Sequence, residues 1–120
     1  MSKLRILEGE RRKPKRMPFE RRGKILDIIK CILEREDYVE LVVIYGGFLD
    51  SEVFRDIDVV LYMDGRLDPD REFLYIEELR DRLEKATGIG IDIQLLNEAP
   101  SSFIYHVLSK GKVIGRRTLA

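Results

Sequence analysis

The sequence has few of the residues and segments on which several protein classes depend. It contains a single cysteine, Cys31, so the chain forms neither a disulfide framework nor a thiolate metal cluster of its own. No apolar run approaches the roughly 18–20 residues that a membrane-spanning helix needs. The basic N-terminus is not followed by the apolar core of a signal peptide. With 120 residues, a length that suits one domain, the sequence predicts a cytoplasmic protein of a single domain.

Side-chain amides are almost absent. Asn97 and Gln94 are the only two, whereas 37% of the residues are charged. Few amides and many charges are a bias reported for hyperthermophile proteins. The composition therefore predicts a thermophilic source and does not bear on activity.

The formal net charge of zero conceals an uneven distribution. Residues 1–24 carry ten basic and three acidic side chains, a surplus of seven that the rest of the chain balances. The segment RRKPKRMP (11–18) is broken by proline and is predicted to be a loop or a mobile arm. We therefore divide the chain into a basic N-terminal arm, 1–17, and one domain, 18–120. Such an arm could bind nucleic acid phosphates through residues 11–24, dock on an acidic protein, or remain solvated.

Beyond the arm, the apolar pattern predicts helices that alternate with strands. Pro18 begins a helix, and a second helix begins at Asp68-Pro69 and ends at Gly88. The predicted inner face of the first comprises Ile25, Ile28, Ile29, Ile32 and Leu33, and that of the second Phe73, Ile76, Leu79, Leu83 and Ala86. Strands are predicted at 40–45, 57–63, 89–96 and 112–115, with a third helix between the last two. This order predicts an α+β (α/β-like) fold, one mixed sheet of about four strands covered by helices.

Two aspartates enter the second predicted strand. Asp56 and Asp58 are two residues apart, so they point to the same face of a strand, roughly 6.5–7 Å apart along the chain. Asp92 is a polar member of the alternating stretch IGIDIQLL (89–96). If these two strands are neighbours, three carboxylates converge, and they repel one another unless a cation lies between them. Oxygen ligands of this kind suit Mg²⁺ or Mn²⁺, and two such ions promote displacement at phosphorus.

A glycine pair, Gly46-Gly47, ends the strand that precedes the aspartates. Without side chains its backbone can approach a triphosphate closely and direct N–H groups at phosphate oxygens. A strand, a glycine pair, a short turn and paired aspartates together predict a site for a nucleotide and metal ions.

The pattern GG-x8-DIDVV followed by a later IDI resembles the nucleotidyltransferase superfamily that includes DNA polymerase beta. It resembles more closely the minimal nucleotidyltransferases of prokaryotes, called MNT, over about residues 25–116. The resemblance implies the nucleotidyltransferase fold, with Gly46 and Gly47 as the turn that contacts the phosphates. It further implies that Asp56, Asp58 and Asp92 are catalytic and ligate two Mg²⁺ ions, for which Mn²⁺ can substitute. Asp92 would also help to activate the attacking hydroxyl.

The activity implied by this resemblance is transfer of an NMP, expected to be AMP, from an NTP to an acceptor hydroxyl. Small members of the family often act as the antitoxin of a HEPN-type toxin, and some add AMP to it. The resemblance thus implies a HEPN-type protein partner, and a second copy of the chain is an alternative. The spacer 48–55 is short for the family and lacks the Arg-Gly element that many small members carry after the glycine turn.

Two other interpretations remain open. The aspartates can be solvated carboxylates at a sheet edge with no chemistry. Alternatively, the chain is a catalytically degenerate nucleotidyltransferase-fold module that binds a partner as an antitoxin or as a nucleic-acid-associated subunit. The lone histidine, His106, is predicted to lie at a helix surface rather than to act in catalysis.

Overall fold

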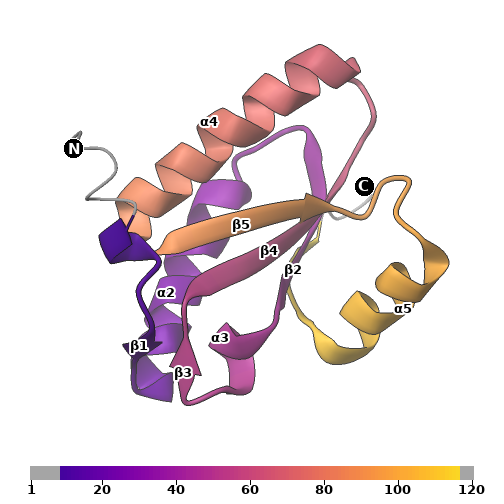
Figure 1. Ribbon diagram of the computed structural model, residues 1–120. Helices are drawn as coiled ribbons and strands as arrows, with labels where there is room; N and C mark the ends of the chain where they lie inside the picture. The colour runs from indigo at the N-terminus through magenta and orange to yellow at the C-terminus, as the bar shows by residue number, and fades with distance from the viewer. Residues whose placement is uncertain (1–8, 117–120) are drawn as a thin grey trace.

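The centre of the fold is a four-stranded sheet with the strand order β5-β4-β2-β6, seen in a computed structural model that describes residues 9–116 (Figure 1). Its strands are β2 (Val39–Tyr45), β4 (Asp56–Met63), β5 (Gly90–Leu95) and β6 (Lys112–Arg116). β2 runs antiparallel to both β4 and β6, whereas β4 and β5 are parallel. The predicted mixed sheet of about four strands is confirmed.

Helices cover both faces of this sheet unequally. α2 (Phe19–Leu33) and α4 (Pro69–Thr87) pack on one face, and α5 (Ser101–Lys110) lies on the other (Figure 1). α4 begins where the sequence predicts, because the Asp68 side chain accepts a hydrogen bond from the Arg71 N–H and Pro69 is the first helical residue. It ends at Gly88, which has the left-handed conformation, φ 73°, that glycine adopts without strain.

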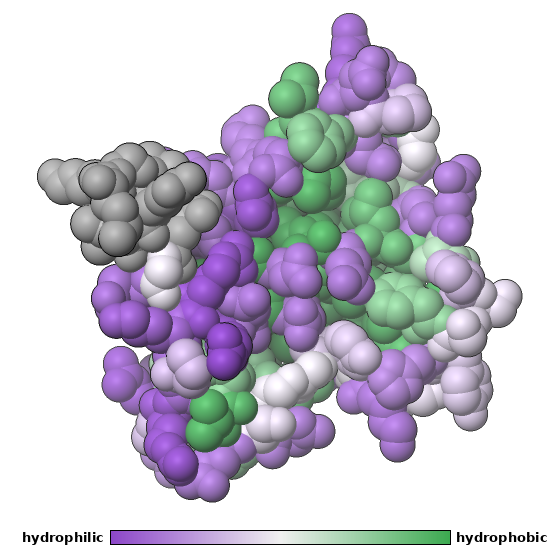
Figure 2. Space-filling view, in the orientation of Figure 1, coloured by the Kyte–Doolittle hydropathy of each residue, from purple (hydrophilic) through white to green (hydrophobic). Residues whose placement is uncertain are grey.

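Alternation along β4 separates the two faces of the sheet. Ile57, Val59 and Leu61 are fully buried in the cluster formed with α2 and α4. The residues between them point the other way, and of these Val60 packs in the smaller cluster with α5. Because α5 covers only part of that face, hydrophilic side chains lie over the middle of β4 and β5 (Figure 2). The paired aspartates of β4 therefore lie on the less covered face.

A small two-stranded sheet connects the N-terminal segment to the turn before β4. It pairs β1 (Lys15–Arg16) with β3 (Val53–Phe54), which follows the single helical turn α3 (Gly47–Asp50). The prediction of a loop or mobile arm over residues 11–18 is wrong at this point, because Lys15 and Arg16 pair in a sheet. The division at residue 17 stays a prediction, and residues 1–8 of the arm lie outside the described residues.

No helix within residues 9–116 combines the length and the apolar character that crossing a membrane requires.

Candidate functional site

The parallel pairing of β4 with β5 places two of the three predicted carboxylates side by side. Asp58 is the register partner of Asp92, and Asp56 is the partner of Gly90. Asp56 and Asp58 share a face of β4 because they are two residues apart, and Asp92 points to the same side of β5. The sequence prediction depended on these strands being neighbours, and in the structure they are.

The carboxylate of Asp58 has an environment that disfavours its ionised form. Burial raises its pKa to about 6, and the negative charges of Asp92 and then Asp56 add to this effect. A carboxylate held among like charges in a half-buried position gains from a bound cation, which would favour its ionised form. Such a set of oxygen donors suits Mg²⁺ or Mn²⁺.

Gly46 brings the glycine turn against this carboxylate. Its φ of +89° is one that side chains rarely allow, and a Cβ built on it would lie 2.5 Å from Asp58 Oδ2. The next residue, Gly47, begins the helical turn α3, slightly earlier than the helix start near residues 49–51 considered from the sequence. The predicted phosphate-contacting turn and the second predicted metal ligand are therefore direct neighbours.

Asp56 has a cationic partner that sequence patterns do not reveal. The Arg12 Nη1 atom lies 3.0 Å from Asp56 Oδ1, and Arg12 Nη2 lies 3.5 Å from Glu84 Oε2. Gly90 leaves room for this contact, because a Cβ there would lie 2.6 Å from Asp56 Oδ1 and 2.9 Å from Arg12. The ion pair lacks hydrogen-bond geometry, so the buried Asp56 Oδ1 accepts a hydrogen bond from no residue that the structure describes.

An unsatisfied buried carboxylate oxygen is a suitable ligand for a hard cation. Even so, within residues 9–116 no three acidic, histidine or cysteine side chains are gathered closely enough to hold a metal ion. Asp56, Asp58 and Asp92 share one face and influence one another, but they do not surround a common point. Their joint binding of a cation requires Asp56 to turn away from Arg12.

Sequence reasoning missed three further residues beside the site. Arg12 and Arg22 escaped because they contact segments far along the chain, which no local pattern reports. Tyr45 is the register partner of Asp58 across β2 and β4, and its ring packs edge-on against His106 of α5, with centroids 5.3 Å apart. His106 therefore packs against the ring of a residue that borders the carboxylates.

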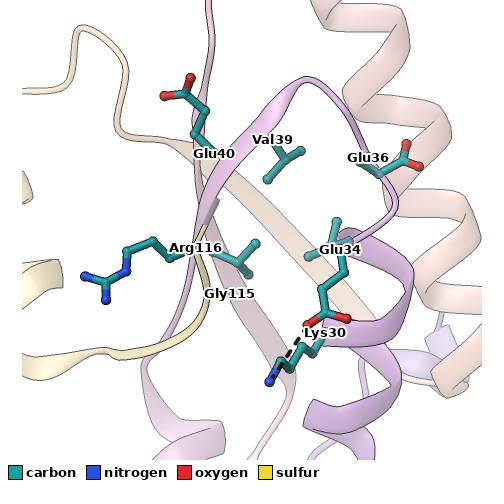
Figure 3. A pocket seen from close by; sticks show the side chains of 9 residues that line it. Lys30, Glu34, Glu36, Val39, Glu40, Gly115 and Arg116 are labelled. Carbon is teal, nitrogen blue, oxygen red and sulfur yellow. Dashed lines mark ion pairs between the residues drawn. The ribbon is translucent and has the colours of Figure 1, made fainter. Parts of the chain in front are cut away.

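A separate pocket lies at the opposite end of β2 (Figure 3). Val39, which begins β2, lines it, whereas Tyr45, which ends β2, is beside Asp58. An ion pair between Lys30 and Glu34 borders the pocket (Figure 3). This pocket is therefore not part of the carboxylate site.

The comparisons with known proteins agree with this arrangement. A family model described as polymerase beta, nucleotidyltransferase, matches residues 27–118. A search of curated proteins gives no match.

Several solved structures share the fold. One is described as tri-AMPylated Shewanella oneidensis HEPN toxin in complex with MNT antitoxin, with 18% identity, a TM-score of 0.59 and coverage of 80% of this chain and 73% of that one. A second, described as the toxin-antitoxin MntA-HepT, has 19% identity and a TM-score of 0.53, with coverage of 83% and 74%. A third, a toxin-antitoxin with AMP-PNP, has 20% identity and a TM-score of 0.57, with coverage of 80% and 73%. At these identities the likeness establishes the fold.

Proposed function

Because the chain belongs to the polymerase beta nucleotidyltransferase family, we propose that it transfers an NMP from an NTP, with ATP as the expected donor, to an acceptor hydroxyl. The register of β4 and β5 carries this proposal, since it sets Asp58 beside Asp92 on the face that Gly46 approaches. A glycine turn next to paired carboxylates is the combination that a metal-bound triphosphate needs.

In this proposal Asp56, Asp58 and Asp92 hold two Mg²⁺ ions, and Mn²⁺ can substitute. When bound, these ions would stabilise the attacking and leaving oxygens of an in-line displacement at the α-phosphorus. The chain's own groups position the reactants. The N–H groups of the Gly46-Gly47 turn bind phosphate oxygens, and the exposed carboxylate of Asp92 accepts the proton of the acceptor hydroxyl.

The balance of the reaction follows from these roles. The acceptor oxygen forms a bond to the α-phosphorus, and the bond from that phosphorus to the bridging oxygen breaks. Pyrophosphate leaves with the bonding electron pair, and the acceptor proton passes to Asp92 and then to water.

We propose a HEPN-type protein as the acceptor. A structure of the same fold is described as a tri-AMPylated HEPN toxin in complex with an MNT antitoxin, and another as a toxin-antitoxin with the nucleotide analogue AMP-PNP. These descriptions support AMP as the transferred group and a protein hydroxyl as its acceptor. A second copy of the chain is the alternative acceptor.

Incubation with Mg²⁺, ATP labelled at the α-phosphate and the protein encoded by the adjacent gene tests this function. We expect label on that protein, and we expect the Asp56→Ala/Asp58→Ala double variant to lose the transfer. Asp27→Ala is the matched control, because Asp27 is an exposed carboxylate on α2. Transfer that persists unchanged in the double variant contradicts the assignment of Asp56 and Asp58.

The ion pair between Arg12 and Asp56 favours a second candidate function. In this alternative the chain is a nucleotidyltransferase-fold module that neutralises its partner by contact, without chemistry. Neutralisation of the partner by the Asp56→Ala/Asp58→Ala variant, together with no label transfer by the unmodified chain, supports this alternative.

Nucleic-acid binding through residues 11–24 has weaker support. Arg22 is buried, and the side chains of Arg12 and Arg16 form ion pairs with Asp56 and Glu52. These three guanidinium groups are therefore directed at the protein itself. Deletion of residues 1–17 should leave any binding of a polyanion unchanged if this segment has no such role.

A further inference from the structure

The turn that follows the glycine pair is held by a buried arginine. Arg22, on α2, is only 3% exposed, and its guanidinium faces backbone carbonyls. The Nη1 atom donates to the Phe48 carbonyl at 2.9 Å and to the Ser51 carbonyl at 2.7 Å. Nη2 donates to the Glu52 carbonyl at 3.1 Å, and Nη1 also lies 3.5 Å from the Gly47 carbonyl. One side chain therefore fixes four peptide units between residues 47 and 52.

Aromatic rings enclose the rest of this guanidinium. Its carbon lies 4.3 Å from the ring centroid of Phe19, 4.9 Å from that of Phe54 and 5.8 Å from that of Phe48. The remaining N–H, on Nε, donates to the Met17 carbonyl at 2.9 Å. Carbonyl oxygens and ring faces stabilise a cation, but they carry no net charge.

Among the residues that the structure describes, no carboxylate forms an ion pair with Arg22. The acidic side chain of the turn itself, Glu52, contacts Arg16 of β1 instead. Buried charges are usually paired, because transfer of an isolated charge out of water is costly. Arg22 therefore leaves a positive charge without a counter-ion directly behind the glycine turn.

We propose that Arg22 is a positioning residue for the triphosphate and that its unpaired charge favours an anion at the Gly46-Gly47 turn. The four carbonyl contacts hold the turn in one conformation, so its N–H groups need little reorganisation to bind phosphate oxygens. The unpaired charge lies next to the Gly47 peptide, where the low dielectric of the interior strengthens attraction to an anion. The inference rests on the proposed function only in placing the phosphates at this turn.

The short spacer gives this arrangement a reason. Eight residues, 48–55, join the glycine pair to Asp56, and they lack a basic side chain directly after the glycines. Arg55 is the sole cation within the spacer and lies at its far end. Arg22 supplies from α2 both the charge and the support that the start of the spacer does not provide itself.

Pyrophosphate binding measured by calorimetry tests this inference on the full chain. We expect Arg22→Gln to weaken the affinity by about tenfold or more, since it removes a charge with low solvent screening. Arg22→Lys keeps the charge without the planar fork and should weaken it less. The control is Arg21→Gln, an exposed neighbour on the same helix, which should bind pyrophosphate as the unmodified chain does.

A second pair of variants separates charge from support and remains informative if Arg22→Gln fails to fold. Phe19→Glu places a carboxylate beside the guanidinium while the carbonyl contacts remain, and Phe19→Gln controls for loss of the ring. We expect Phe19→Glu to bind pyrophosphate several-fold more weakly than Phe19→Gln. Hydrogen exchange of the amides of residues 47–52 should accelerate in Arg22→Lys and stay slow in Phe19→Glu.

Each outcome decides between the inference and the proposed function. Equal pyrophosphate affinity in Arg22→Lys, Phe19→Glu and the unmodified chain overturns the inference and leaves nucleotidyl transfer standing. Absence of pyrophosphate binding by the unmodified chain also overturns it. Arg22-dependent pyrophosphate binding by a chain that transfers no label refutes the proposed activity and retains the inference.

Discussion

Replacement of Asp58 by asparagine should stabilise the folded chain at neutral pH in the absence of metal. Asp58 has a pKa raised from 3.8 to about 6, first by burial and then by Asp92 and Asp56. The folded state therefore binds the Asp58 proton more tightly than the unfolded state does. This contribution to stability is fully present below about pH 3.8 and is lost as the pH rises through about 6. Above that pH the ionised carboxylate is a burden that asparagine removes.

The size of the effect follows from the shift. A rise of about two pKa units corresponds to about 3 kcal/mol. Asp58 is half-exposed, and solvent screening reduces this figure to about 1–1.5 kcal/mol. For a domain of this size, that gain raises the Tm by about 5 °C.

Thermal denaturation followed by circular dichroism in EDTA, from pH 4 to pH 8, measures this difference. We expect Asp58→Asn to exceed the unmodified chain in Tm at pH 8 and to match it at pH 4. Asp27→Asn, at an exposed position of α2, should show no such pH dependence. An Asp58→Asn variant that is equally stable or less stable than the unmodified chain at pH 8 refutes the reasoning, because Asp58 would then carry no unfavourable charge.

Three further substitutions have definite expected outcomes. Arg12→Gln should raise the Mn²⁺ affinity severalfold by electron paramagnetic resonance, because it frees Asp56 from its ion pair; unchanged or weaker affinity contradicts this. Gly46→Ala should abolish ATP binding and destabilise the fold by about 1–3 kcal/mol in urea melts, because its φ is +89° and its Cβ would clash with Asp58. Asn97→Ala should cost about 1–3 kcal/mol without altering Mn²⁺ affinity, since this side chain hydrogen-bonds only the backbone between β4 and β5 and no carboxylate.

The strands and the aspartates could be predicted because their signals are local. β-branched runs ending at a glycine pair and at turn residues predicted β2 and β4, and a spacing of two placed Asp56 and Asp58 on one face. The position of Asp92 depended on strand order, which alternation within a strand does not specify. The family resemblance, not the periodicity, implied that β4 and β5 are neighbours.

Helix faces were predicted in direction but not in extent. Leu79 and Leu83 of α4 are buried as predicted, whereas Phe73 is 64% exposed, because periodicity does not tell how much of a helix the sheet covers. In α2, Ile28 was predicted to face the core and is 38% exposed.

The buried position that a hydropathy pattern could not supply is that of Arg22. An arginine breaks the apolar stripe of α2 and is normally assigned to the surface. It is buried here because the carbonyls and aromatic rings of a turn more than 25 residues away receive its guanidinium. The same distance along the chain hid the contact of Arg12 with Asp56.

The central claim is that Asp56, Asp58 and Asp92 form one metal site beside the glycine turn. The most direct measurement is the number of Mn²⁺ ions bound per chain in the presence of a non-hydrolysable ATP analogue, counted by electron paramagnetic resonance. We expect about two ions in the unmodified chain and in Asp27→Asn, as in two-metal phosphoryl-transfer sites, and none in Asp56→Asn/Asp58→Asn. The same number of Mn²⁺ ions in the double variant as in the unmodified chain would contradict the claim.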